Sequence, residues 1–111
     1  MRVKSIRMEL WYIHPSIEKY IDNLEARTRV QVARLILILM EKGSTLGMPF
    51  SKQIENKMYE LRHLGNVNIR VLYTFHNDRI VVLDVIKKQS QKLRKNDLKK
   101  AYSRLQLLHD I

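Results

Sequence analysis

The order of apolar and polar residues along the chain first predicts a strand followed by a helix. Residues 8–13 (MELWYI) are aromatic and apolar in the way that is typical of a strand. Pro15 ends this strand, because the residue before a proline is disfavoured in helical conformation. Ser16 can then cap a helix. Its apolar residues recur at helical spacing: Ile17, Tyr20, Ile21 and Leu24.

A second and longer helix is predicted from Thr28, as its cap, to Gly43, where a left-handed residue can end it. Apolar residues follow one another so densely in this segment that they leave little of its circumference polar. We therefore expect this helix to be largely buried. The two helices are joined by a few residues and form a helical hairpin, which must cover a sheet.

The pattern after residue 43 changes to that of strands. Residues 44–57 contain Gly47 and Pro49 and are predicted to be a loop. Three strands follow, joined by two three-residue turns, at 58–64, 68–75 and 79–86. Asn96 can cap a last helix over 97–108. We therefore predict one α+β domain spanning 1–111, in which a helical hairpin packs on a twisted, mainly antiparallel sheet of about four strands and a C-terminal helix follows.

Simple registers in the two hairpins would bring charged residues together. Arg62 would lie opposite Arg70, and Arg70 opposite Asp84, on one face with Glu60 and with Leu72, Val82 and Ile86. The opposite face would be apolar and suited to the helices: Leu61, Val71, Tyr73, Phe75, Val81, Leu83 and Val85. We expect the arginines to converge on solvent and Tyr73 to pack in the core.

Two arginines opposite each other repel, which suggests a site built to receive an anion such as phosphate. The alternative is that Glu60 and Asp84 simply neutralise them in a surface ion network. Basic residues just beyond the strands favour the anion site: Lys87, Lys88, Lys92, Arg94 and Lys95.

The composition limits the classes of partner and of binding site that the protein could have. Lys and Arg number 21 against 11 Asp and Glu, and the net charge of +10 favours nucleic acid, an acidic protein or an anionic membrane surface. The absence of cysteine excludes disulfides and thiolate metal sites, and the four histidines lack ligand spacing. No signal peptide or membrane span is recognisable, so we expect a cytoplasmic protein with no metal and no cofactor. Glu60 and Asp84 beside arginine would be weak bases, which leaves charge stabilisation by Arg and Lys.

These features occur in an order that resembles a known family. Pro49, the Tyr59–Arg62 strand, the Arg70–Tyr73 strand, Lys88 with Lys92, and the helix from Asn96 are similar to the phage-derived Gp49/HigB-like group of the RelE/ParE toxin superfamily. The resemblance covers roughly residues 14–108. It implies a RelE-like fold and a toxin of a type II toxin–antitoxin pair.

The resemblance also implies an activity and partners. Such toxins enter the ribosome and cleave mRNA without a metal, by attack of the 2′-hydroxyl on the neighbouring phosphate. Arg62, Arg70 and Lys88 would be catalytic, with Glu60 and Asp84 supporting them. Lys87, Lys92, Arg94 and Lys95 would bind RNA. The partner that restrains the toxin would be a helix-turn-helix, HigA-like antitoxin.

Two alternatives remain open, and a departure from the family pattern favours one of them. Asp84 stands where members often have a histidine, so the usual acid–base group is missing. The chain could then be a binding module that retains the fold without the chemistry. The other alternative is a ParE-like toxin that poisons DNA gyrase and cuts no RNA.

Overall fold

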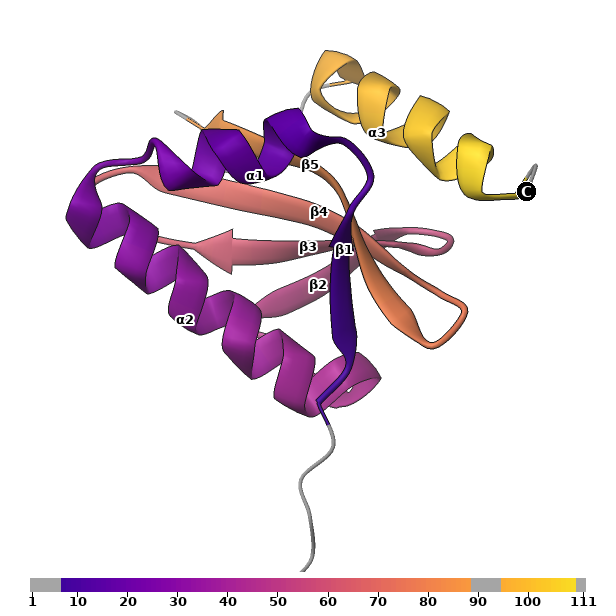
Figure 1. Cartoon of the computed structure of the whole chain (residues 1–111), viewed down its shortest axis with the longest axis horizontal. Helices are drawn as coiled ribbons and strands as arrows, with labels where there is room; N and C mark the ends of the chain where they lie inside the picture. The colour runs from indigo at the N-terminus through magenta and orange to yellow at the C-terminus, as the bar shows by residue number, and fades with distance from the viewer. Residues whose placement is uncertain (1–6, 89–94, 110–111) are drawn as a thin grey trace, which may run out of the picture.

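The computed structural model describes residues 7–88 and 95–109. Within these residues lie three helices and five strands (Figure 1). In chain order they are β1 Glu9–Tyr12, α1 Pro15–Asp22, α2 Ala26–Lys42, β2 Ser51–Glu55, β3 Met58–His63, β4 Asn68–His76, β5 Arg79–Lys88 and α3 Lys95–His109, with a short 3-10 turn η1 at Gly43–Thr45 between α2 and β2. The α+β class is confirmed.

The sheet has five strands in the order β1-β5-β4-β3-β2, where the sequence predicted about four. β1 runs parallel to β5, and the other neighbours are antiparallel, so the sheet is mixed. The strand missed is β2, which lies in the segment predicted to be a loop. Its sequence SKQIE has one apolar residue, Ile54, because β2 is an edge strand and most of its side chains face solvent.

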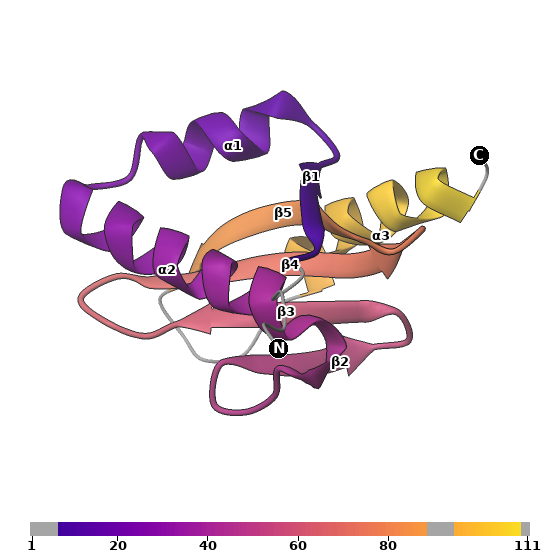
Figure 2. The same cartoon turned by 60° about the horizontal axis from the view of Figure 1, so that its bottom comes forward.

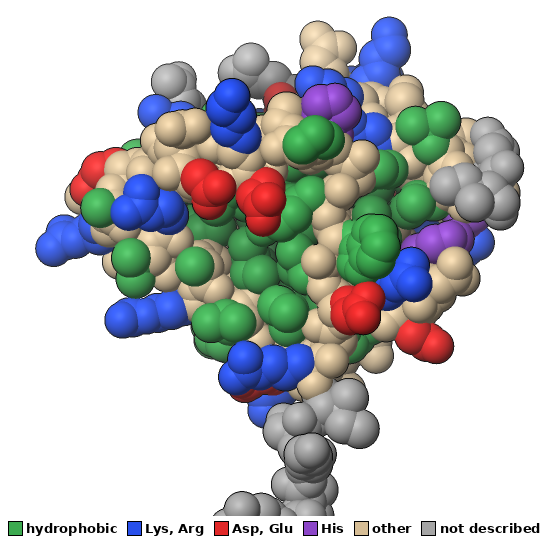
Figure 3. Space-filling view, viewed as in Figure 1, with side chains coloured by type: hydrophobic (Ala, Val, Ile, Leu, Met, Phe, Trp, Pro, Cys, Tyr) green, Lys and Arg blue, Asp and Glu red, His purple; other side chains and the backbone are tan. Residues whose placement is uncertain are grey.

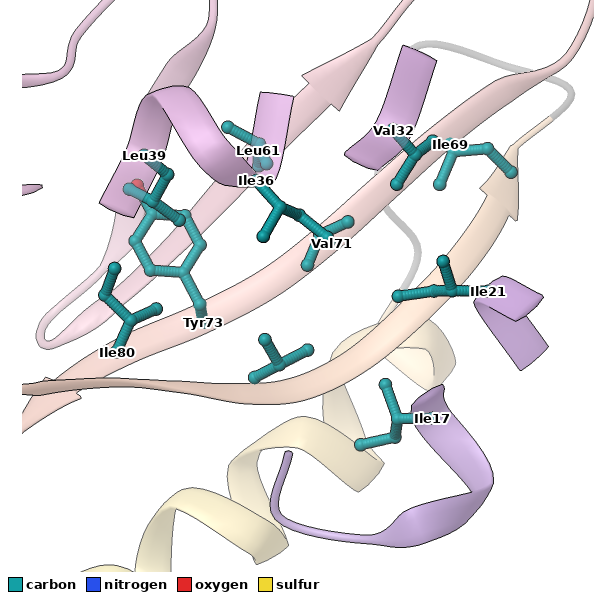
Figure 4. Close-up of a cluster of buried hydrophobic side chains, with 11 residues drawn as sticks. Ile17, Ile21, Val32, Ile36, Leu39, Leu61, Ile69, Val71, Tyr73 and Ile80 are labelled. Carbon is teal, nitrogen blue, oxygen red and sulfur yellow. The ribbon is translucent and has the colours of Figure 1, made fainter. Parts of the chain in front are cut away.

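Helices cover both faces of the sheet (Figure 2). α1 and α2 pack on one face through Ile17, Ile21, Val32, Ile36 and Leu39, which meet apolar side chains of β3, β4 and β5 (Figure 4). α3 packs on the other face, where Ala101 and Leu105 meet a second buried cluster: Met58, Leu72, Val81 and Leu83. We call these the hairpin face and the α3 face.

Tyr73 belongs to the hairpin-face cluster, as predicted, and is buried. Its hydroxyl shares a hydrogen bond with that of Ser51, and burial raises the pKa of the phenol. The side chain therefore has a packing role.

The predicted register is confirmed in one hairpin and wrong in the other. Arg62 pairs with Arg70 as expected. In the β4–β5 hairpin, Asn77 and Asp78 adopt φ angles of 51° and 61° and make a two-residue turn, so that His76 pairs with Arg79. Left-handed residues at both central positions are what such a turn requires.

An irregularity at Leu72–Tyr73 shifts the register of β4–β5 again. Asp84 therefore pairs with Leu72, and Arg70 pairs with Ile86 rather than with Asp84. Side chains of β5 also change faces relative to the prediction: Val82 packs on the hairpin face, whereas Val81 and Leu83 pack against α3. The two-residue turn moves β5 by one residue, which exchanges its faces between the turn and the irregularity. The extra residue at the irregularity restores the predicted faces beyond it, where Val85 pairs with Val71.

The helix caps also differ from the prediction. His14 caps α1, because its Nδ1 accepts a hydrogen bond from the backbone N–H of Ser16 at 3.1 Å. Glu25 precedes α2 without a side-chain cap, and Thr28 is buried inside the helix. α3 begins at Lys95, so Asn96 lies within it and does not cap it.

The expectation that α2 is largely buried is wrong, because its apolar residues Val30 and Leu37 are exposed and only Thr28, Val32, Ile36 and Leu39 of the helix are buried. Apolar side chains gather in the middle of the face seen in Figure 3, with Lys and Arg around its rim. Among the helices of residues 7–88 and 95–109, none is long and apolar enough to cross a membrane.

Candidate nucleic-acid interface

Three charged side chains from neighbouring strands lie together on the α3 face. Arg62 of β3 pairs with Arg70 of β4, and Glu60 lies two residues before Arg62, so all three point to the same side. Glu60 Oε1 is 3.5 Å from Arg62 Nε, and Glu60 Oε2 is 3.6 Å from Arg70 Nε. One carboxylate thus lies between two guanidinium groups. We call this group the Arg–Glu–Arg cluster.

The cluster is more buried than the sequence predicted. The exposed fraction of the side chain is 0% for Arg70, 7% for Glu60 and 15% for Arg62. The expectation that both arginines face solvent is therefore wrong for Arg70, and Arg62 marks the outer end of the cluster. Burial lowers the pKa of Arg70, Glu60 raises it in part, and Arg62 lowers it further.

The hydrogen bonds of the cluster are incomplete. Both ion-pair distances exceed the usual hydrogen-bond range of about 2.7–3.2 Å. Within the described chain, Arg70 Nε and Nη2, Arg62 Nε and Glu60 Oε2 have no hydrogen-bond partner. Arg70 Nη1 reaches the backbone carbonyl of Ile69 at 3.5 Å.

The cluster therefore combines two cations with one anion, and some of its guanidinium N–H groups have no hydrogen-bond acceptor in the described chain. Burying polar groups without partners is costly, and a guanidinium donates most strongly to a phosphate or a carboxylate. The arrangement is chemically suited to an anion that accepts hydrogen bonds from the unpartnered N–H groups of Arg70.

Asp84 does not join this cluster. Its Oδ1 lies 3.5 Å from Arg104 Nη1 and accepts a hydrogen bond from the backbone N–H of Val85 at 2.9 Å. Arg104 Nη1 also donates to the carbonyl of Leu83 at 2.7 Å. Asp84 thus attaches α3 to the sheet, which accounts for a carboxylate at this position.

Lys88 lies on the α3 face, because it pairs with Asn68, two pairs beyond the pair that Arg70 makes with Ile86. Its side chain is buried, and Nζ lies 2.8 Å from Asp97 Oδ2 in the first turn of α3. The predicted catalytic lysine is therefore held in an ion pair.

This ion pair predicts a stability effect. Lys88→Met should lower the free energy of unfolding by about 1–3 kcal/mol, because Asp97 loses a charged hydrogen-bond donor. Asp97→Asn is the matched variant, and urea denaturation measures both. If Lys88 acts only by holding α3, growth inhibition will fall in parallel in the two variants. A loss of activity confined to Lys88→Met would instead assign the lysine a direct role with RNA.

The other predicted RNA-binding residues divide into three groups. Lys95 is exposed at the start of α3. Lys87 is also exposed, but it pairs with Ile69 and therefore points to the opposite side of the sheet from Lys88. Lys92 and Arg94 lie outside the described residues.

Lys52 is a candidate that the sequence did not reveal. It lies directly opposite Glu60 in the β2–β3 pair, so it shares the face of the Arg–Glu–Arg cluster, and it is exposed. Because the sequence predicts a loop over residues 44–57, it does not place this lysine near the arginines. It adds a cation at the open edge of the cluster.

Side chains that could bind a metal do not gather in the described part of the chain. There, no three His, Cys, Asp or Glu residues are grouped closely enough to hold a metal ion. His63 is occupied on the hairpin face, where its ring nitrogens meet the carbonyl of Val67 at 2.9 Å and Gln31 Oε1 at 2.7 Å. Its position does not bring it to the cluster.

Comparisons with known proteins agree on the fold. The family described as Phage derived protein Gp49-like matches residues 19–106. A free-state structure of a mutant E. coli toxin RelE superposes with a TM-score of 0.66 at 15% identity, covering 89% of this chain and 98% of that one. The toxin–antitoxin complex RelBE2 from Mycobacterium tuberculosis contains a chain with a TM-score of 0.56 at 13% identity, covering 75% of this chain and 100% of that one. A comparison with curated protein sequences gives no match.

Proposed function

This chain belongs to the phage-derived Gp49-like family and has a RelE-like fold, and on that premise we propose that it is the toxin of a type II toxin–antitoxin pair. The proposed activity is ribosome-dependent cleavage of mRNA. The observation that carries the proposal is the buried Arg–Glu–Arg cluster, whose guanidinium groups retain donors without partners.

The proposed reaction transfers a phosphoryl group within the RNA, from the 5′-oxygen of one nucleotide to the 2′-oxygen of the nucleotide before it. The 2′-hydroxyl oxygen loses its proton to water and forms a bond to the adjacent phosphorus, while the bond from phosphorus to the 5′-oxygen of the next nucleotide breaks. That oxygen takes up a proton from water, so a cyclic phosphate and a free 5′-hydroxyl result. Negative charge grows on the phosphate oxygens in the transition state. Arg62 and Arg70 stabilise that charge, and they do so most strongly in surroundings that exclude water.

Arg62 is the side chain that moves to admit the phosphate. Its guanidinium is held by long contacts, 3.5 Å to Glu60 Oε1 and 3.9 Å from Nη1 to Met48 Sδ. An outward swing of Arg62 would bring the donors of Arg70 within reach of a phosphate oxygen. Glu60 would keep the Arg70 guanidinium oriented during this movement.

The proposed partner is a cognate antitoxin with a HigA-like helix-turn-helix. The net charge of +10 favours an acidic antitoxin segment, which would compete with RNA for the same cations. The similarity to a chain of a toxin–antitoxin complex supports an antitoxin as partner.

A second candidate function is a binding module without catalysis. It is favoured by one observation: Asp84, which replaces the usual histidine, is bound to Arg104, and the carboxylate of Glu60 in the cluster is engaged by two arginines. Such a module would bind RNA and would not cut it.

Expression of the wild-type chain in bacteria tests these functions. We expect growth to stop and primer extension to reveal mRNA breaks in phase with codons, because the proposed cleavage occurs on the ribosome. Intact mRNA with DNA damage would instead indicate a gyrase poison. Unimpaired growth would indicate the binding module and refute the toxin.

A further inference from the structure

A pocket of about 370 Å³ opens beside Arg62, at the edge of the sheet. β2 begins at Ser51, which pairs with Leu61, so β3 extends beyond the end of its neighbour. α2 and the loop before β2 complete the walls. The residues that line it include Arg34, Leu35, Pro49, Phe50, Arg62 and Leu64.

Phe50 is an exposed aromatic side chain on a backbone that is held in place. Its carbonyl accepts the backbone N–H of Arg62 at 2.8 Å, and its own N–H donates to the carbonyl of Gly47 at 3.1 Å. The exposed fraction of Phe50 is nevertheless 42%. The backbone of Phe50 is held by hydrogen bonds and its ring is open to solvent, so the ring offers a preorganised surface for stacking.

The lining of the pocket selects for one kind of ligand. Leu35, Pro49 and Leu64 are apolar, Arg34 and Arg62 are cationic, and no acidic residue is among the described lining residues. Such a lining disfavours a cationic ligand and suits a flat aromatic ring joined to a phosphate. The volume also lies within the range of about 300–1,000 Å³ that is usual for small-molecule pockets.

We propose that this pocket holds a nucleobase of the RNA, stacked on Phe50, next to the phosphate that Arg62 contacts. The inference rests on the proposed function, because it assigns a base-binding subsite to the same RNA. Bases stack on aromatic side chains with little regard to sequence, so the pocket positions the strand whatever the base.

Binding of small probes to the purified full-length protein tests this subsite without cleavage. Nucleoside 3′-monophosphates should bind more tightly than ribose 5-phosphate, which lacks a base. Phe50→Ala should weaken nucleotide binding about 5- to 150-fold, as expected for the loss of one stacked base, and leave ribose 5-phosphate binding unchanged. Phe50→Trp should restore nucleotide binding. Tyr20→Ala is the control, because Tyr20 is exposed to a similar extent, 40%, and lies on α1 outside the pocket.

The outcomes separate this inference from the proposed function. Equal binding of nucleotides and ribose 5-phosphate, or nucleotide binding that Phe50→Ala leaves unchanged, would overturn the subsite even if the wild-type chain cuts mRNA. A Phe50-dependent preference for nucleotides in a protein that leaves mRNA intact would uphold the subsite and refute cleavage. A pocket that binds an acidic peptide through Phe50 but no nucleotide would also overturn the inference.

Discussion

Replacing Arg70 with methionine is expected to abolish growth inhibition and leave the protein folded. Removing one charge-stabilising donor from an active site typically lowers the rate about 10²- to 10³-fold. Methionine fills much of the same volume, and the change leaves Glu60 and Arg62 as a neutral pair 3.5 Å apart. Because a buried charge without complete hydrogen bonds contributes little to stability, we expect the free energy of unfolding to be unchanged or higher.

Growth curves measure the toxicity of the variant and urea denaturation measures its free energy of unfolding. Arg79→Met is the matched control, because Arg79 lies against Trp11, at the opposite end of β5 from Ile86, which pairs with Arg70. The Arg79→Met protein should remain toxic. An Arg70→Met protein that is stable and fully toxic would remove Arg70 from the site. A protein that unfolds would show that Arg70 is retained for structure.

Glu60→Gln is expected to cause the largest loss of stability. The change leaves Arg62 and Arg70 opposite each other on neighbouring strands without the carboxylate between them. Removing one partner of a buried ion pair costs about 3–5 kcal/mol. Small proteins are stable by about 5–15 kcal/mol in total, so a substantial unfolded fraction is expected on warming.

A double variant shows whether repulsion between the arginines is the cause. In the Arg70→Met background, Glu60→Gln should cost less by about 1–3 kcal/mol, because Arg62 then has no buried cation facing it. Chemical denaturation of the four proteins completes the cycle. Equal costs of Glu60→Gln in both backgrounds would mean that the two arginines do not interact through Glu60.

The fold was predictable where apolar residues follow one another and unpredictable where they do not. The helical hairpin, β3, β4, β5 and α3 carry long apolar patterns. β2 carries one apolar residue, because an edge strand that faces solvent needs no more. The turn at Asn77–Asp78 had a readable signal, since both residue types tolerate the left-handed conformation. The irregularity at Leu72–Tyr73 has no such signal in the sequence.

The candidate site was predictable only in part, because only some of its features depend on neighbouring residues in the sequence. The pairing of Arg62 with Arg70 follows from the short turn between β3 and β4, which is a local feature. The burial of Arg70 and the ion pairs of Asp84 and Lys88 with α3 depend on contacts between distant segments. No pattern in the sequence places α3 over that face of the sheet.

The most direct test of the central claim is in vitro mRNA cleavage on programmed ribosomes, mapped by primer extension. We predict breaks in the codon at the vacant decoding site with the wild-type protein, and none with folded Arg70→Met at equal concentration. Identical breaks with both proteins would contradict the claim that the Arg–Glu–Arg cluster stabilises the scissile phosphate.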